Sequence, residues 1–340
     1  MTILIVIIGI SFLIFIHELG HFFVAKKLGL LVEEFGFGFP PRLFSKKIGE
    51  TVYSFNLLPF GGFVRIYGEE QSKKSEEHPN VPNQRIFYSQ PAWKRTLIIV
   101  AGVFMNFIIG WLLMSAVFFT GTPQAVLVSD VLPGSAAEAA EIFPQDQVLG
   151  FESAGEFVEF INQNRGKEVN LNLLRNGEEL TIRVTPSQNE QAALGVAVAD
   201  AGIPKHSLPA SLWEGLKSAV FIIGAIFAAF ANLLWGLLTQ GQVLVDFVGP
   251  IGIFGVANQA GALGFLYLVQ LIALISLNLT VINILPFPAL DGGRLFFIFL
   301  EKIKGSPLSQ NFERSANTIG FLLLIFLMIA ITVRDVARLF

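Results

Sequence analysis

The chain has 340 residues, of which 53% are hydrophobic and only 14% charged, and its mean hydropathy is +0.63. This composition exceeds what a soluble globular domain needs to fill a core, so it places the chain in a membrane. The net charge of -3, without a strongly basic domain, excludes a nucleic-acid partner, and the absence of cysteine excludes disulfides and Cys-ligated metals. A metal site would have to consist of His, Asp and Glu side chains.

Apolar stretches long enough to cross a bilayer occur along the whole chain. A hydrocarbon core of ~30 Å requires roughly 20 apolar residues per helix. Four stretches are clear: Thr2 to Ala25, Leu97 to Thr120, Phe265 to Leu285 and Ile319 to Val333. The first has no basic residue ahead of it and no small-residue cleavage site before Lys26, so we expect it to remain as a span rather than to be removed as a signal peptide.

The segment between the first two spans is rich in basic residues. Eleven of the 23 Lys and Arg residues lie between Lys26 and Arg95, several of them beside the ends of spans. Because cytoplasmic loops carry an excess of basic residues, we expect this loop to be cytoplasmic and the N-terminus to be outside. Within the loop, Thr51 to Ile66 contains two β-prone runs about the break Pro59-Phe60-Gly61-Gly62. This pattern predicts a membrane-associated β-hairpin, and the polar, aperiodic residues 68–84 are typical of a mobile linker.

A region with the composition of a water-soluble domain follows the second span. It contains two alternating strand patterns and a turn between them, at Val169–Leu173, Leu180–Val184 and Arg175–Glu178. Pro133-Gly134-Ser135-Ala136-Ala137, followed by a short helix and the run Pro144 to Leu149, resembles the PDZ family, in which this run joins a strand to a helix and then to the next strand. We therefore expect one PDZ-like α+β domain over residues 122–205, outside the membrane.

The chemistry is concentrated in the first span, which contains His17-Glu18-Leu19-Gly20-His21. Two histidines four residues apart lie on one face of a helix, where both rings can reach a single Zn²⁺ at about 2.0–2.1 Å. Glu18 is then placed as a general base rather than a ligand, because the metal lowers the pKa of water from about 15.7 towards 7. A chance occurrence is disfavoured, since ionisable residues in a membrane helix cost of the order of several kcal/mol unless they are paired or bind metal.

A catalytic zinc site usually takes three protein ligands, so one more residue is needed. His78 and His206 both lie outside apolar spans, which leaves Asp291 as the better candidate. Asp291 ends the run Asn283-Ile284-Leu285-Pro286-Phe287-Pro288-Ala289-Leu290-Asp291, where two prolines break the helix and the next two residues, both glycine, allow close backbone approach. The alternative is that Asp291 only caps the following helix as an N-cap residue.

Together, HELGH in the first span and NILPFPALDGG after a later one resemble the site-2 protease family of intramembrane metalloproteases, and the resemblance reaches across the chain. The chain is similar to the bacterial branch with a PDZ domain between the second and third spans, which includes the protease that regulates the sigma-E envelope response. The resemblance implies that His17, His21 and Asp291 bind zinc and that Glu18 is catalytic.

The same resemblance implies residues that contact the substrate, in the glycine-rich hairpin and the Asn-Pro-x-Pro element: Gly61, Gly62, Asn106, Asn283, Pro286 and Pro288. Asn106 follows a small-residue motif of the second span, Ala101-Gly102-Val103, where the family often has Ala-Gly-Pro. We expect Asn106 or Asn283 to lie near the oxyanion. Interhelical hydrogen bonding is the alternative role for both side chains.

The requirement that the three zinc ligands meet predicts the topology. His17 and His21 lie towards the cytoplasmic end of a span that runs from outside to inside, so Asp291 must lie near the same side. One crossing by the third span achieves this. A further crossing by Ser218–Leu238, which is equally apolar, would bring Asp291 to the far face, so we expect that stretch to lie on or against the outer face.

The expected fold is therefore a polytopic α-helical membrane protein with four transmembrane helices, a membrane-associated β-hairpin and one inserted PDZ-like α+β domain. The expected segments are a first span with HELGH (1–25), a cytoplasmic loop with the hairpin (26–96), a second span (97–121), the PDZ-like domain (122–205), outer-face amphipathic or membrane-associated helices (206–262), a third span with LDGG (263–294), a cytoplasmic loop (295–314) and a fourth span (315–340).

The resemblance implies a monomeric zinc metalloendopeptidase of the bacterial cytoplasmic (inner) membrane, with its active site towards the cytoplasm. It would cleave the transmembrane segments of single-span proteins, such as anti-sigma factors after a first cleavage or signal-peptide remnants, in regulated intramembrane proteolysis. An extended substrate strand is expected to pair with the edge of the hairpin, within the lipid bilayer. The PDZ-like domain would bind a substrate's new C-terminus or act as a size filter, and the sequence does not choose between these roles.

Two other classes of function fit parts of the sequence. A non-enzymatic membrane PDZ scaffold with a structural metal site would normally need four ligands and would have no use for Glu18. A metal transporter would carry acidic or His residues on several spans, whereas Leu97–Thr120 and Phe265–Leu285 have none. Zinc content and cleavage of a single-span reporter by wild type and Glu18→Gln separate all three classes.

Overall fold

The computed structural model describes residues 2–69, 81–122, 125–175, 177–188, 192–240 and 249–337. The chain divides into two compact units. The first unit consists of Met1–Met114, Gly215–Gly261 and Leu268–Phe340, and the second of Ser115–Glu214 and Ala262–Tyr267.

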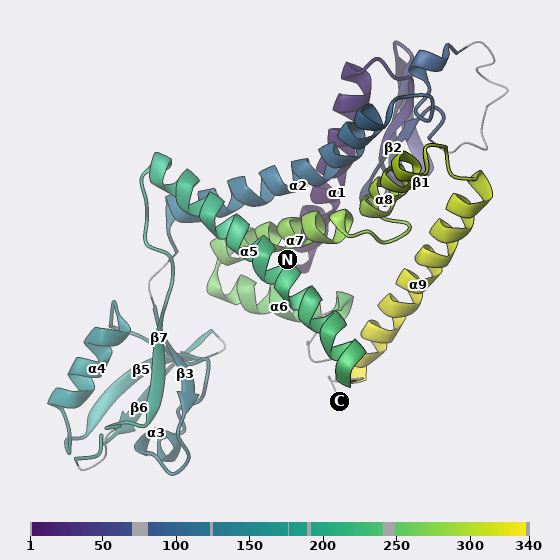
Figure 1. Ribbon diagram of the computed structural model, residues 1–340. Helices are drawn as coiled ribbons and strands as arrows, with labels where there is room; N and C mark the ends of the chain where they lie inside the picture. The colour runs from purple at the N-terminus through teal and green to yellow at the C-terminus, as the bar shows by residue number, and fades with distance from the viewer. Residues whose placement is uncertain are drawn as a thin grey trace. The chain divides into compact units, whose positions relative to one another are not determined.

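Apolar helices make up most of the first unit (Figure 1). They are α1 (Thr2–Lys27), α2 (Ala92–Thr120), α5 (Leu208–Gln240), α6 (Pro250–Leu263), α7 (Phe265–Ile284), α8 (Asp291–Lys304) and α9 (Gln310–Ala337). Within the described residues, five helices are long and apolar enough to cross a membrane, namely α1, α2, α5, α7 and α9. The prediction of several membrane-crossing helices is therefore confirmed. Four crossings stay a prediction, because α5 meets the same criteria of length and composition.

The region after the third predicted span differs from the expectation. The third span was expected to occupy 263–294, with a break at its prolines, and a loop to occupy 295–314. α7 ends at Ile284, where that break was expected, but α8 occupies Asp291–Lys304 in place of the first half of the loop. The two prolines of the intervening loop end α7, because proline lacks the N–H that a helix needs and restricts the residue before it. α8 ends at Gly305, whose φ of 75° is the left-handed conformation that glycine favours.

A β-sheet packs against α1 in the first unit. It consists of β1 (Val32–Ile48) and β2 (Thr51–Ile66), which pair antiparallel. The predicted hairpin is wrong in its pairing: the two arms of β2 lie on either side of the first half of β1, so that Gly36 pairs with both Ser54 and Phe63. Only glycine fits between the arms, because a Cβ on Gly36 would lie 2.7 Å from the Ser54 hydroxyl and collide with the Phe63 ring.

One apolar cluster joins this sheet to α1, α2 and α8. Figure 1 shows the same elements side by side. The cluster contains Phe22, Ala25, Leu30, Val32, Phe35, Ile66, Phe87, Ile98, Ile99 and Ile298. A short 3-10 helix, η1 (Asn83–Arg85), precedes α2. The cluster fixes the sheet and α8 beside the part of α1 that carries the two histidines.

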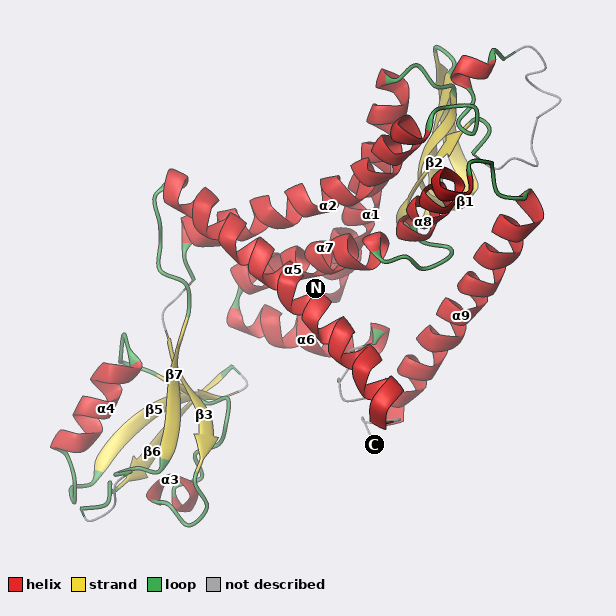
Figure 2. Cartoon of the chain, viewed as in Figure 1, coloured by secondary structure: helices red, strands yellow, loops and turns green. Residues whose placement is uncertain are grey.

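The second unit is a small α+β domain, shown with its strands in yellow in Figure 2. Its antiparallel sheet has the order β6-β5-β4-β3-β7. The elements are β3 (Ala125–Val131), α3 (Ala136–Ala139), β4 (Gln147–Val148), α4 (Ala154–Gln163), β5 (Val169–Arg175), β6 (Glu178–Val184) and β7 (Val196–Ala201). The two predicted strands and the short helix are confirmed, and Asn176 of the predicted turn lies outside the described residues. The PDZ assignment stays a prediction.

Candidate metal centre

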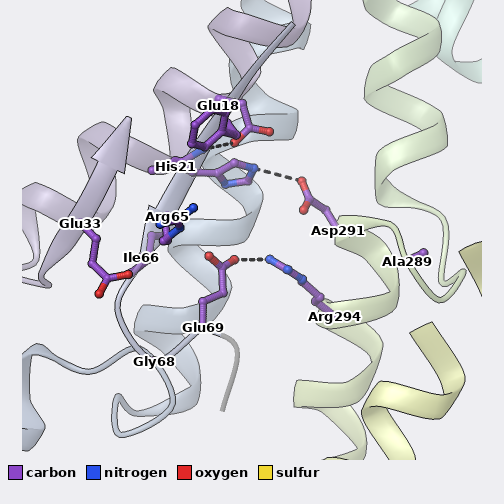
Figure 3. Close-up of a pocket in the computed structure, with 12 residues that line it drawn as sticks. Glu18, His21, Glu33, Arg65, Ile66, Gly68, Glu69, Ala289, Asp291 and Arg294 are labelled. Carbon is purple, nitrogen blue, oxygen red and sulfur yellow. Dashed lines mark hydrogen bonds and ion pairs between the residues drawn. The ribbon is translucent and has the colours of Figure 1, made fainter. Parts of the chain in front are cut away.

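The two histidines of α1 and the aspartate of α8 converge on one point. Asp291 Oδ2 lies 2.9 Å from His17 Nε2 and 3.3 Å from His21 Nε2, and the two Nε2 atoms are 3.1 Å apart. Figure 3 shows Asp291 and His21 pointing toward each other from their two helices. The structure therefore brings Asp291 to two histidines that lie about 270 positions earlier in the sequence.

The other ring nitrogens of both histidines face α2. His21 Nδ1 lies 2.8 Å from the carbonyl oxygen of Ile98, which can only accept, so Nδ1 carries the proton and Nε2 keeps its lone pair. His17 Nδ1 lies 3.3 Å from the side-chain amide of Asn106. Asn106 is fully buried and its Oδ1 has no other partner among the described residues. Rotation of this amide by half a turn lets Oδ1 accept from His17 Nδ1.

Two glycines set the close approach of α1 and α2. A Cβ on Gly20 would lie 2.8 Å from the Ala101 carbonyl carbon of α2. A Cβ on Gly102 would lie 2.9 Å from His17 Cε1 and would collide with His21 Nε2. Gly102, within the small-residue motif of α2, thus leaves room for both imidazoles against this helix.

The loop before α8 is shaped so that Asp291 faces the histidines. Leu290, not Asp291, occupies the N-cap position of α8, which removes the N-cap alternative. Ala289 has a φ of 75°, a conformation that is uncommon without glycine, and its N–H donates to Asn317 Oδ1 at 3.0 Å. A Cβ on Gly293 would lie 2.9 Å from Pro288 Cα, so the loop can fold back on the helix only over glycine.

Glu18 lies beside the three converging atoms but is held by a different element. Its carboxylate offers an oxygen within 4.8 Å of the ring nitrogens of both histidines. Its Oε2 accepts a hydrogen bond from the backbone N–H of Val64 in β2, at 3.1 Å. The arm of β2 that contains Val64 therefore presents a backbone N–H to Glu18.

A cavity of about 390 Å³ opens beside this cluster. Figure 3 shows its lining side chains. They come from α1, from the start of β1, from β2 and the turn after it, and from α8 and the loop before it: Glu18, His21, Glu33, Phe63, Val64, Arg65, Ile66, Gly68, Glu69, Ala289, Asp291 and Arg294. One wall is therefore the edge of a strand, and the opposite wall is α8.

The donor set fits zinc. Ligands at about 2.0–2.1 Å from a tetrahedral Zn²⁺ lie about 3.3 Å from one another, close to the separations found here. Asp291 Oδ2 is buried and makes no hydrogen bond of acceptable geometry with any described residue, although two ring nitrogens lie next to it. A buried acceptor beside two acceptor nitrogens is costly unless a cation or a proton lies between them.

The expected substrate-contacting residues fall into three groups. Gly61 lets β2 approach α1, because an added Cβ would lie 2.7 Å from Ile14, and a Cβ on Gly62 would lie 3.0 Å from the carbonyl oxygen of Gly36 in β1. Asn106 lies behind His17. Asn283, Pro286 and Pro288 lie at and after the end of α7, and none of these six residues is among the described residues that line the cavity.

Two buried polar contacts near the site were not expected from the sequence. Arg95 at the start of α2 pairs with Glu301 of α8 at 2.6 Å, and both side chains are nearly buried. Tyr88 donates a short hydrogen bond to Glu313 of α9, and burial and that carboxylate raise the pKa of Tyr88. The first contact ties α2 to α8, and the second ties the segment before α2 to α9. The partners are more than 200 positions apart in sequence, and no local pattern marks such pairs.

Apolar helices of spanning length and a buried cluster of two histidines and an aspartate define a multi-pass membrane protein with a metal-binding type of site among its helices. Residues 5–327 match the model of Peptidase family M50, so the chain belongs to this family, the site-2 proteases. Several bacterial proteins are similar over their whole length. Zinc metalloprotease RasP of Shouchella clausii is 31% identical, covering 100% of this chain and 99% of the relative. Regulator of sigma-W protease RasP of Bacillus subtilis is 30% identical, with the same coverage.

Proposed function

We propose that this chain is an intramembrane zinc endopeptidase in which His17, His21 and Asp291 hold the metal and Glu18 is the general base. The convergence of three donor atoms within 3.3 Å is the observation that carries the proposal. Family membership supports it, because the similar proteins include zinc metalloproteases.

The residues of the chain have separate tasks in this mechanism. Zinc, when bound, supplies a Lewis acid that polarises the scissile carbonyl and makes water a stronger nucleophile near neutral pH. Glu18 takes a proton from the attacking water and later gives it to the leaving amide nitrogen, so that one carboxylate serves both steps. The Val64 N–H keeps the carboxylate turned toward the cavity rather than toward lipid.

Asn106 is proposed as a positioning residue that acts through His17. A ligand histidine whose outer nitrogen is hydrogen-bonded keeps its tautomer and orientation, and loss of such a partner typically weakens metal binding about 10- to 100-fold. Asn106→Leu should therefore weaken zinc binding by this factor in a chelator competition, while Asn106→Asp, which keeps the acceptor, retains most of the affinity. Equal zinc affinity in wild type and Asn106→Leu would contradict this role.

Substrate is proposed to enter as an extended strand along the arm of β2 that contains Val64. A peptide bond in a helix is shielded by its own hydrogen bonds, so the segment must unwind, and a strand edge can take over the freed backbone groups. Val64 is the position to test, because it lines the cavity and proline there removes its backbone N–H. Val64→Pro should retain zinc and lose turnover of intact membrane substrates. Equal turnover would refute strand docking.

The four-crossing topology is proposed with α5 on the outer side, because only then does α7 bring Asp291 to the side of His17. The chain has no cysteine, so single cysteines report the side directly. A cysteine at Thr239 should be labelled from outside, like one at Glu159 in the second unit, and unlike one at Lys46 of β1. Labelling of Thr239→Cys only from the cytoplasm would exclude this topology.

The proposed substrates are single-span membrane proteins, of the anti-sigma-factor or signal-peptide-remnant type, cleaved in regulated intramembrane proteolysis in the bacterial cytoplasmic membrane. One relative is named for regulating sigma-W, which supports the first type. The second unit is proposed to be an extracytoplasmic PDZ-like domain that binds a new C-terminus or filters by size. A non-enzymatic scaffold with a structural metal is the second candidate, and the next experiment separates the two.

The deciding experiment measures bound zinc and cleavage of a single-span reporter in detergent. Wild type should contain one zinc and cleave the reporter, Glu18→Gln should retain zinc and lose cleavage, and Asp291→Ala should lose both. Unchanged cleavage by Glu18→Gln would remove this residue from the mechanism. Zinc without cleavage in the wild type would favour the scaffold.

A further inference from the structure

The cavity beside the metal centre contains a second charged pair that the proposed chemistry does not use. Arg294 of α8 forms a short ion pair with Glu69, which lies three residues after the end of β2. Both residues line the same cavity as Glu18, His21 and Asp291. Figure 3 shows the two side chains facing each other across the gap between the strand side and α8.

This pair and the metal centre share one wall of the cavity, α8, which carries both Arg294 and Asp291. Arg294 lies one helical turn after Asp291, so both side chains project from one face of α8. Glu69 follows the strand arm that presents Val64 to Glu18. A substrate strand that lies along this arm with its carbonyl at the metal must therefore pass beside Glu69.

The side chains of Glu69 and Arg294 differ in their exposure. The Glu69 side chain is 17% exposed, whereas the Arg294 side chain is 43% exposed. A largely buried carboxylate needs a cationic partner at all times, while a half-exposed guanidinium can turn to water at little cost. The Glu69 carboxylate consequently forms a cation-binding site. The Arg294 guanidinium occupies this site and can be displaced from it.

The charge of the surrounding segments indicates which cation a substrate would bring. α1 ends with Lys26 and Lys27, and α2 begins with Lys94 and Arg95, so this end of the helices is the basic and hence cytoplasmic end. The same rule applies to a single-span substrate, whose cytoplasmic flank carries Lys or Arg. When the scissile bond of such a substrate lies at the metal, the cytoplasmic flank of the substrate lies beside Glu69.

We propose that Glu69 is a specificity residue that binds a Lys or Arg on the cytoplasmic flank of the substrate span, and that Arg294 occupies this place in the free enzyme. The inference rests on the proposed function. It predicts opposite effects for the two partners: loss of Glu69 removes the preference for a basic flank, whereas loss of Arg294 removes the competitor and increases the preference. An ion pair with only a structural role would move the preference in the same direction in both variants.

The test uses three single-span reporters that differ at one flank position, which holds Arg, Gln or Glu. The ratio of kcat/KM for the Arg and Gln reporters is measured for wild type, Glu69→Gln and Arg294→Gln, each with its zinc content determined. Wild type should prefer the Arg reporter by about fivefold, the value of a partly exposed ion pair of about 1 kcal/mol. Glu69→Gln should bring the ratio to about 1, and Arg294→Gln should raise it above the wild-type ratio.

A matched control is the pair Glu50 and Arg85, at 2.6 Å in the same loop but outside this cavity. Glu50→Gln and Arg85→Gln should leave the Arg to Gln ratio unchanged. Equal cleavage of all three reporters by wild type, or a shift in the same direction by both Glu69→Gln and Arg294→Gln, would overturn the inference while leaving the protease assignment intact. Failure of zinc-loaded wild type to cleave any reporter would instead contradict the proposed function.

Discussion

The two compact units bury different kinds of residue. The second unit has an ordinary apolar core, in which Leu173 and Val126 are fully buried and Phe157 is 1% exposed. The first unit exposes apolar side chains such as Phe221, at 76%, and buries polar ones such as Asn106, at 0%, and Arg95, at 9%. Helices in lipid gain little from contact between apolar side chains, so close backbone packing and polar contacts determine their positions.

The two units are therefore sensitive to different kinds of substitution. Removing methyl groups from the second unit opens a cavity in a core that excludes water. In the first unit the positions of the helices depend on a few specific contacts. These are the Arg95–Glu301 ion pair, the close approach at Gly102 of α2, and the hydrogen bonds to the outer nitrogens of the histidines. Four changes test this contrast.

Arg95→Met should have the largest effect. It leaves the carboxylate of Glu301 buried without its partner, which typically costs about 3–5 kcal/mol of unfolding free energy. Because Glu301 belongs to the helix that carries Asp291, we also expect zinc content to fall. Thermal unfolding and bound zinc are the measurements. The double variant Arg95→Met with Glu301→Leu should regain most of the stability, and a double variant less stable than the single one would contradict this account.

Leu173→Ala tests the apolar core of the second unit. Leu173 is fully buried in the core of the second unit, so its truncation should cost roughly 2–5 kcal/mol there. Hydrogen exchange of peptides from 169–184 should accelerate, while zinc content stays at the wild-type level, because no metal-site residue belongs to this unit. Loss of zinc in this variant would show that the two units are not independent.

Gly102→Ala should weaken zinc binding specifically, without a general loss of stability. The added methyl collides with the two imidazoles, so zinc affinity should fall at least about tenfold, by displacement of a ligand. Gly224→Ala in α5 is the matched control, because no atom lies within 4 Å of the Cβ it would add. Chelator competition compares the two variants. Equal zinc affinity in both would mean that the histidines can move away from α2 freely.

Much of the site was predictable because its signals are local. The i, i+4 spacing places His17 and His21 on one helical face, and the prolines and glycines around Asp291 predict a break with close backbone packing. The structure brings these three residues together. The two strands of the second unit were likewise visible as alternating patterns over a few residues.

The missed features depend on pairing between distant segments. The first half of β1 lies between the two arms of β2, a pairing that alternation alone cannot distinguish from a simple hairpin. The Val64 N–H that holds Glu18 is a backbone group and carries no residue signature. A charged residue near the end of a span is common, so neither Arg95 nor Glu301 indicates a partner in the sequence. Only the folded chain shows that they form an ion pair.

The smallest expected effect concerns an exposed charge pair of the first unit. Hydrogen bonds from Arg85, and then from Lys26, hold the pKa of Glu50 below its usual value of 4.5. A lowered folded-state pKa means that the ionised form stabilises the fold above pH 4.5 and that this contribution is lost as pH falls through the folded-state pKa. Because the Glu50 side chain is 38% exposed, the contribution should be at most about 0.5 kcal/mol. Wild type should therefore melt slightly above Glu50→Gln at pH 7, and this difference in Tm should shrink as the pH falls below 4.5. A constant difference in Tm across this range would show that Glu50 stabilises the loop by packing rather than by charge.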